Sequence, residues 1–108
     1  MIDVKIRYGE SGPFTLIAHG HANQTRNEDG RDLVCCAAST IVTTLAISCA
    51  QIKGAVVNYH QESGYAALTV SNTETLWEEL MPRFRMAEDG LQGLMDQYPQ
   101  ALRLTVEN

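Results

Sequence analysis

Twice along this chain, two short strand-like stretches are followed by one long stretch with helical periodicity. Near the N-terminus, apolar residues alternate with polar ones at Ile2, Val4 and Ile6. This alternation predicts a half-buried strand. Residues 14–18 follow a turn and predict its hairpin partner. Residues 55–60 and 65–70 are rich in Val, Tyr and Leu and predict a second hairpin around residues 61–64.

Each predicted hairpin is followed by a stripe of residues at helical spacing. The first helix is expected at residues 33–51, with one side made of Val34, Ala38, Ile41, Leu45, Ser48 and Ile52. The second stripe is Leu76, Leu80, Phe84, Leu91, Met95 and Tyr98. Because it keeps its register across Pro82, one kinked helix is expected there rather than two.

The remaining apolar alternation lies near the end of the chain and predicts a last strand: Leu102, Leu104 and Val106. The order is therefore ββαββαβ, in a chain of 108 residues that suits a single domain over residues 1–108. The expected fold class is α+β, a two-layer sandwich with a mostly antiparallel five-stranded sheet and two helices.

The net charge and the number of cysteines exclude several classes of protein. The net charge of −5 repels phosphate backbones, so no direct nucleic-acid binding is expected, and it attracts a basic partner. The N-terminus lacks a basic region before an apolar one, so no secretory signal and a cytoplasmic location are expected. The longest apolar run, residues 37–50, is broken by Ser and Thr, and no membrane association is expected. Three cysteines, two of them adjacent, make a poor disulfide framework.

One segment carries the residue types that catalysis most often uses. It reads Gly20-His21-Ala22, then a polar stretch over residues 23–31, then Asp32-Leu33-Val34-Cys35. As N-cap, Asp32 would place Cys35 in the first helical turn, where backbone N–H groups and the helix dipole favour a thiolate. The same N–H groups are candidate donors to the oxyanion of an acyl-transfer intermediate. Alternatively, Cys35 is a small buried apolar residue.

His21 is the candidate base, with Gly20 before it allowing close backbone approach. His19 is its rival, on the same face if the strand continues that far. The polar stretch at residues 23–31 is expected to be an exposed loop that folds back as a lid, with Gly30 as its hinge. Either histidine alone could equally be an ordinary surface residue.

Other residues near the cysteine have two interpretations. Asp32 is an N-cap, or it orients a protonated His21. Ser39, one turn after Cys35, hydrogen-bonds near the sulfur or back-bonds to the Cys35 carbonyl. Cys36 points about 100° away from Cys35, so core packing is expected for it, as for Cys49.

A metal site is a weaker interpretation. His19, His21, Cys35 and Cys36 are residue types that bind zinc, but adjacent helical cysteines diverge and the spacing fits no common zinc signature. The sequence therefore predicts neither a metal nor a cofactor.

The segment from Gly20-His21-Ala22 through Gly30-x-Asp32-Leu33-Val34-Cys35 to Ala37-Ala38-Ser39 resembles the ribosomal-processing cysteine proteases of the Prp family. The resemblance implies a cysteine endopeptidase with His21 as base and Cys35 as nucleophile, and the order of elements agrees with that family. It also implies a homodimer. The implied substrate is the large-subunit ribosomal protein numbered twenty-seven, made with a short N-terminal extension that the enzyme removes.

Two alternatives to a peptidase are open at this level. One is a non-enzymatic acidic protein that binds a basic ribosomal component with the same loop and surface. The other is a redox sensor that uses Cys35 and Cys36, which would form a sulfenate or an intermolecular bond because adjacent cysteines pair only with strain.

Overall fold

The computed structural model describes residues 1–10, 12–21 and 32–108 of the chain. Its elements run in the predicted order ββαββαβ and form an α+β fold. They are β1 (Ile2–Tyr8), β2 (Phe14–Gly20), α1 (Leu33–Ala50), β3 (Val56–Glu62), β4 (Tyr65–Ser71), α2 (Thr73–Gln97) and β5 (Leu102–Glu107).

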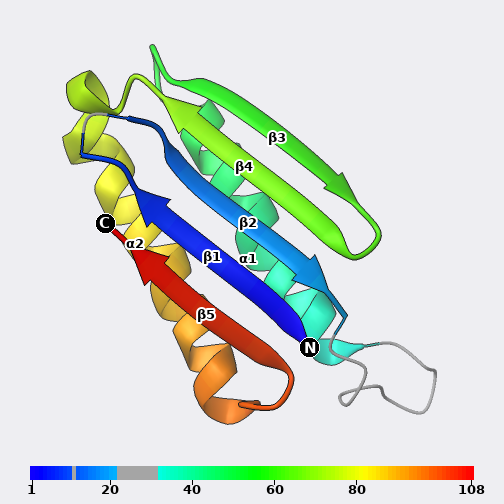
Figure 1. Ribbon diagram of the computed structural model, residues 1–108. Helices are drawn as coiled ribbons and strands as arrows, with labels where there is room; N and C mark the ends of the chain where they lie inside the picture. The colour runs from blue at the N-terminus through cyan, green and yellow to red at the C-terminus, as the bar shows by residue number, and fades with distance from the viewer. Residues whose placement is uncertain (11, 22–31) are drawn as a thin grey trace.

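The strands form one five-stranded sheet in the order β3-β4-β2-β1-β5 (Figure 1). Both predicted hairpins are present, and β2 and β4 also pair antiparallel in the middle of the sheet. The exception is β5, which pairs parallel with β1 after the chain crosses back through α2. The sheet is therefore mostly antiparallel, as expected, with mixed pairing at one edge.

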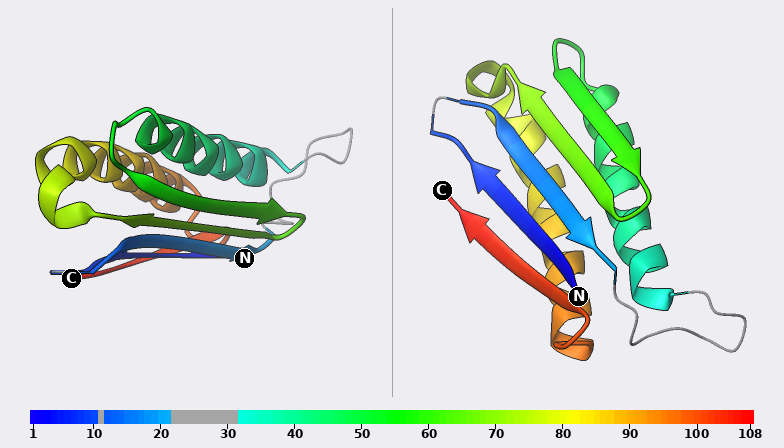
Figure 2. Two further views of the ribbon diagram at one scale, coloured as in Figure 1. Left: turned by 90° about the horizontal axis from the view of Figure 1, so that it is seen from above. Right: turned by 45° about the vertical axis from the view of Figure 1, so that its right-hand side comes forward.

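The helices cover one face of the sheet, so the molecule has two layers (Figure 2). In β1, Ile2, Val4, Ile6 and Tyr8 are buried beneath the helices. The residues between them face the other side, where Lys5 pairs with Glu107 of β5 at 3.1 Å. This two-residue alternation explains why the sequence reveals the strand so clearly.

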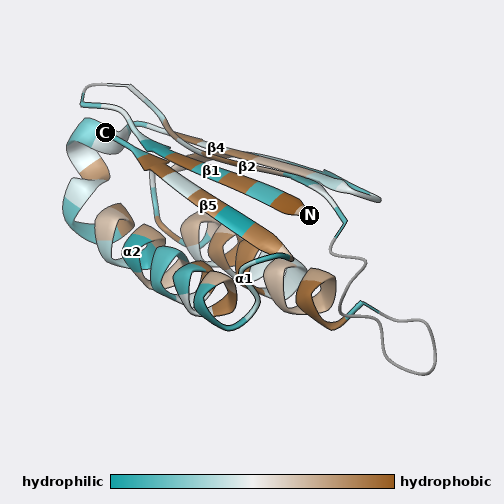
Figure 3. Cartoon of the chain, turned by 60° about the horizontal axis from the view of Figure 1, so that its bottom comes forward, coloured by the Kyte–Doolittle hydropathy of each residue, from teal (hydrophilic) through white to brown (hydrophobic). Residues whose placement is uncertain are grey.

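Helix α1 packs against β3, β4 and α2, and it is more uniformly apolar than α2 (Figure 3). Its buried residues are Val34, Ala38, Val42, Leu45, Ala46 and Cys49. The predicted stripe is thus rotated, because Ile41 and Ser48 are only half-buried. By length and a mean hydropathy of 2.0, α1 would pass as a membrane span. Packing in this core accounts for only part of that apolarity, because 33% of the helix is buried and Leu33 and Ile47 are exposed.

Helix α2 is continuous through Pro82, as predicted, but its distortion lies elsewhere. The non-helical residue is Leu76, with φ −110° and ψ 17°. The buried face includes Leu80, Phe84 and Leu91, whereas Tyr98 follows the helix and is exposed. The prediction of one helix is therefore confirmed, but the assignment of Tyr98 to its apolar stripe was wrong.

An aromatic cluster fills the end of the core where β1 finishes. The ring of Phe14 lies 5.3 Å from those of Phe84 and Trp77, and 5.2 Å from that of Tyr8, all edge-on. Such edge-to-face pairs stabilise beyond their buried area. The opposite end, where β1 begins and β2 finishes, contains a groove whose lining includes the small side chains of Ala18, Ala38 and Ala66.

Candidate active site

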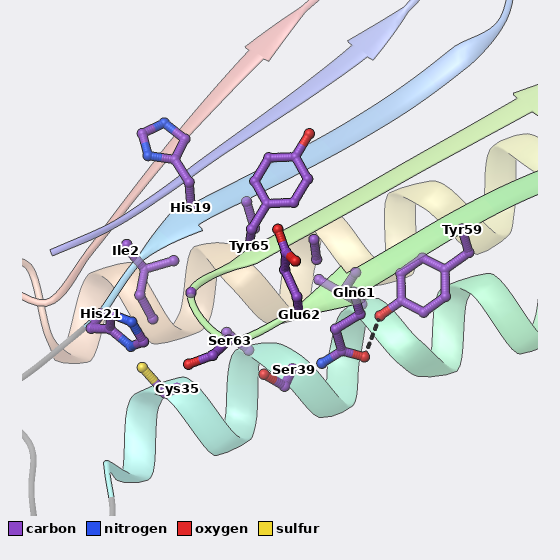
Figure 4. A pocket seen from close by; sticks show the side chains of 16 residues that line it. Ile2, His19, His21, Cys35, Ser39, Tyr59, Gln61, Glu62, Ser63 and Tyr65 are labelled. Atoms are coloured by element: carbon purple, nitrogen blue, oxygen red, sulfur yellow. Dashed lines mark hydrogen bonds between the residues drawn. The ribbon is translucent and has the colours of Figure 1, made fainter.

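A groove of about 430 Å³ opens between the end of β2, the β3–β4 turn and the first turns of α1 (Figure 4). Three separate segments supply its chemistry. The end of β2 brings His21, helix α1 brings Cys35 and Ser39, and the hairpin brings Gln61 and Gly64. The structure thus brings the predicted base, the predicted nucleophile and the predicted serine to one cavity.

Cys35 is held in the first turn of α1 by the predicted cap. Asp32 takes extended backbone angles, φ −91° and ψ 109°, and its Oδ1 accepts a hydrogen bond from the Cys35 N–H at 3.0 Å. The N-cap prediction is therefore confirmed. The thiol of Cys35 is half-buried and lies at the groove, where the positive end of the helix favours an anion.

The same cap engages two of the helix-start donors that were expected to serve an oxyanion. The N–H of Cys35 donates to Asp32 Oδ1, and the N–H of Cys36 donates to the Asp32 carbonyl at 3.0 Å. These two helix-start donors are thus already used.

His21 follows directly after β2, and its backbone is anchored on two sides. The carbonyl of His21 accepts a hydrogen bond from the amine of Met1 at 2.7 Å. The N–H of the preceding Gly20 donates to the Gly64 carbonyl at 2.9 Å. Gly20 has a φ of +104°, and a Cβ there would collide with the Met1 carbonyl. A glycine is therefore required at this position.

The imidazole of His21 packs on the β3–β4 turn. A Cβ at Gly64 would lie 2.6 Å from His21 Nε2 and 3.2 Å from Cε1. Gly64 also has a φ of +75°, so the turn requires a glycine both for its backbone and for the space that the ring occupies. In Figure 4 the imidazole and the Cys35 thiol point toward one another at the end of the groove.

His19 does not share this position. Its side chain is exposed and points away from Cys35 (Figure 4), although His19 also lines the groove. The two histidines were expected to share a face only if the strand continued to residue 21. The strand ends at Gly20, and the positive φ of that residue breaks the alternation between residues 19 and 21. His21 is consequently the histidine that the fold directs to the thiol.

The three cysteines lie in three environments, and all are free thiols. Cys36 is exposed, so the expectation of core packing was wrong, because the turn from Cys35 carries it away from the sheet. Cys49 is fully buried, as expected, and burial raises the pKa of its thiol to about 11. This burial and raised pKa make Cys49 chemically inert in the native protein.

The remaining predicted site residues divide into two groups. Ser39 lines the groove one turn after Cys35. Gly30 and the predicted lid at residues 23–31 lie outside the described residues. Among residues 1–10, 12–21 and 32–108, three or more His, Cys, Asp or Glu side chains nowhere gather closely enough to hold a metal ion.

Sequence reasoning missed the residues that the second hairpin contributes, which include Tyr59, Gln61 and Gly64. The predicted turn at residues 61–64 was too long, because β3 continues to Glu62 and only two residues connect the strands. A Ser-Gly pair between two β-rich segments was the available signal for that short turn.

A thiol at a helix start, facing an imidazole in an open groove, defines a protein equipped for nucleophilic thiol chemistry. The sequence profile of the family described as Cysteine protease Prp matches residues 1–103. The chain therefore belongs to this family, and it is a cysteine protease. A search among curated proteins found no match.

Solved structures share the whole fold. A crystal structure of an essential ribosomal processing protease Prp from S. aureus, with a covalently linked product peptide, is 22% identical with a TM-score of 0.80. That match covers 98% of this chain and 99% of the other. The same enzyme with a substrate peptide is 21% identical, with a TM-score of 0.77 and coverages of 98% and 99%. The protein SMU.848 from Streptococcus mutans is 19% identical, with a TM-score of 0.75 and coverages of 100% and 96%.

Proposed function

We propose that this protein is an endopeptidase in which Cys35 is the nucleophile and His21 is the general base. The observation that carries the proposal is the meeting of these two side chains at the groove, one from the end of β2 and the other from the start of α1 (Figure 4). They come from segments that the fold must bring together, and each is anchored by its own backbone hydrogen bonds.

The chemistry follows from the two groups. His21 takes the thiol proton, and the Cys35 thiolate attacks the carbonyl carbon of the scissile amide. The imidazolium then gives its proton to the leaving nitrogen, the C–N bond breaks, and the first product departs as an amine. Water, deprotonated by His21, attacks the resulting thioester. The second product leaves as a carboxylic acid, and the Cys35 thiol is restored.

We further propose that the substrate is a basic ribosomal protein, the large-subunit protein numbered twenty-seven, from which the enzyme removes an N-terminal extension. The related S. aureus enzyme is described as a ribosomal processing protease and holds peptides in its crystals. The net charge of −5 on this chain suits a basic partner. A homodimer and a cytoplasmic location accompany this proposal as predictions.

The test is incubation of the purified protein with the full-length ribosomal protein, read by intact mass. Loss of the extension is expected for the native protein, and no cleavage is expected for Cys35→Ala or His21→Ala. Cys36→Ala is the matched control, because it removes an adjacent but exposed thiol and should retain activity. Full activity of Cys35→Ala would refute the proposal.

Membership in a protease family argues against the non-enzymatic alternative. The redox alternative is tested separately by mapping oxidised cysteines after mild peroxide treatment. As a peptidase, the protein should be alkylated rapidly at Cys35 near neutral pH, and Cys49 should react only when the protein unfolds.

A further inference from the structure

The wall of the groove formed by α1 carries a row of residues four positions apart. Cys35, Ser39 and Thr43 follow one another along the helix at this spacing, so they lie along one side. With a rise of about 1.5 Å per residue, Thr43 lies about 12 Å along the helix from Cys35. A peptide whose carbonyl is at Cys35 can therefore extend over Ser39 toward Thr43.

Strand β3 faces this row with two side chains from its inner face. Tyr59 and Gln61 are two residues apart in β3 and share that face. The Tyr59 hydroxyl donates to Gln61 Oε1 at 2.9 Å, and it lies 3.2 Å from Thr43 Oγ1. The Thr43 hydroxyl is a second donor to Gln61 Oε1, at 3.4 Å. Three side chains from the strand and the helix thus form one small hydrogen-bond network.

In this arrangement the amide oxygen of Gln61 faces the two hydroxyls. Because the two hydroxyls hold Oε1, the NH₂ group is directed the opposite way, toward the side where Ser39 lies (Figure 4). Within the described part of the chain, the protein supplies no hydrogen-bond acceptor for Gln61 Nε2. The amide therefore presents two N–H donors to whatever occupies the groove.

We propose that the Gln61 NH₂ group donates a hydrogen bond to a main-chain carbonyl of the bound peptide, two or three residues from the bond that is cleaved. This proposal rests on the proposed function of Cys35 and His21. The separation follows from geometry, because the amide lies between one and two helical turns from the Cys35 end. An extended peptide covers that length with two or three residues at about 3.3 Å each.

The chemistry that Gln61 recognises is the peptide backbone, so the contact is independent of substrate side chains. Gln61 touches the substrate in this arrangement, whereas Tyr59 and Thr43 are positioning residues that act through its amide. Loss of one such hydrogen bond is expected to lower kcat/KM about three- to tenfold. The effect should fall mainly on KM, because the contact lies away from the reacting carbonyl.

The experiment compares native protein with Gln61→Met, which keeps the length of the side chain but has no N–H donor. Cleavage is measured on a peptide that spans the extension junction of the ribosomal protein, and Cys35 alkylation by iodoacetamide is measured in parallel. We expect Gln61→Met to raise KM and leave the alkylation rate unchanged. Tyr59→Phe should raise KM by a smaller factor, because the amide keeps only its Thr43 partner. His60→Ala, on the opposite and exposed face of β3, is the matched control.

Shortening the peptide from either end identifies the contacted residue. The difference between native protein and Gln61→Met should vanish once the peptide ends before the second or third residue on one side of the cleaved bond. Unchanged KM in Gln61→Met would overturn the inference, as would a parallel fall in Cys35 alkylation. If the native protein fails to cleave the peptide at all, the proposed function fails instead, so the two failures are distinct.

Discussion

Replacing Gly64 with alanine tests whether the β3–β4 turn holds the imidazole of His21 in place. Gly64 has a φ of +75°, a backbone conformation that costs an L-residue about 1–2 kcal/mol. Gly64→Ala should therefore lower the free energy of unfolding by about 1–2 kcal/mol. This loss comes from the backbone alone, so other residues with a Cβ should show it too, and Asn and Asp should show it least.

The new methyl group would also displace the His21 ring, the proposed general base. A Cβ at residue 64 lies 2.6 Å from His21 Nε2, whereas ordinary contact begins at 3.4 Å, so the ring must move by about 0.8 Å. A misplacement of about 1 Å at a reacting group can cost about a hundredfold in rate. We therefore expect kcat/KM of Gly64→Ala to fall by about one to two orders of magnitude.

The assay combines thermal or urea denaturation with peptide cleavage under conditions where both variants stay folded. Gly54→Ala is the matched control, because Gly54 also has a positive φ, +92°, but a Cβ there meets only Asn72 and Leu76, at 3.8 Å or beyond. It should lose similar stability and keep its activity. Equal activities for the two alanine variants would refute the idea that Gly64 makes room for the His21 ring.

Two further predictions concern the residues around Cys35 and in the core. Asp32→Ala removes the cap on the Cys35 N–H and should lower the unfolding free energy by about 1 kcal/mol. Asp32→Asn keeps an acceptor oxygen and should retain most of that stability. Equal losses for the two variants in denaturation would contradict the role of the cap. Burial raises the pKa of Cys49 from 9.0 to about 11, so the folded state favours its thiol form; this contribution is complete below pH 9 and is lost between pH 9 and 11. Between pH 9 and 11 the unfolding free energy of the native protein should fall by about 2 kcal/mol more than that of Cys49→Ala. Equal falls in the two proteins, measured by denaturation, would contradict this prediction.

Much of the fold could be predicted because its signals are local. Two-residue alternation in β1 and the helical stripe of α2 report which faces are buried, and the structure has both elements. The cap was equally local, since Asp32 and the Cys35 N–H are only three residues apart. A short polar side chain before an apolar run predicts that contact without knowledge of the remaining chain.

Other features depended on contacts between distant segments. Which histidine reaches the thiol was decided at Gly20, where a positive φ and a close approach to Met1 across the sheet both require glycine. The contact of Gln61 with Thr43 required β3 to lie over α1, a pairing of strand and helix that no spacing in the sequence encodes.

The sequence by itself determined the order of elements, the capped start of α1 and the candidate pair His21 and Cys35, because these depend on neighbours along the chain. The tertiary structure alone decided which side of α1 faces the core. That helix is apolar nearly all round, so its composition allowed Cys36 to be buried as readily as Cys49. Docking on the sheet buried Cys49, exposed Cys36 and left Cys35 at the groove, because a rigid helix can present only one face to the core.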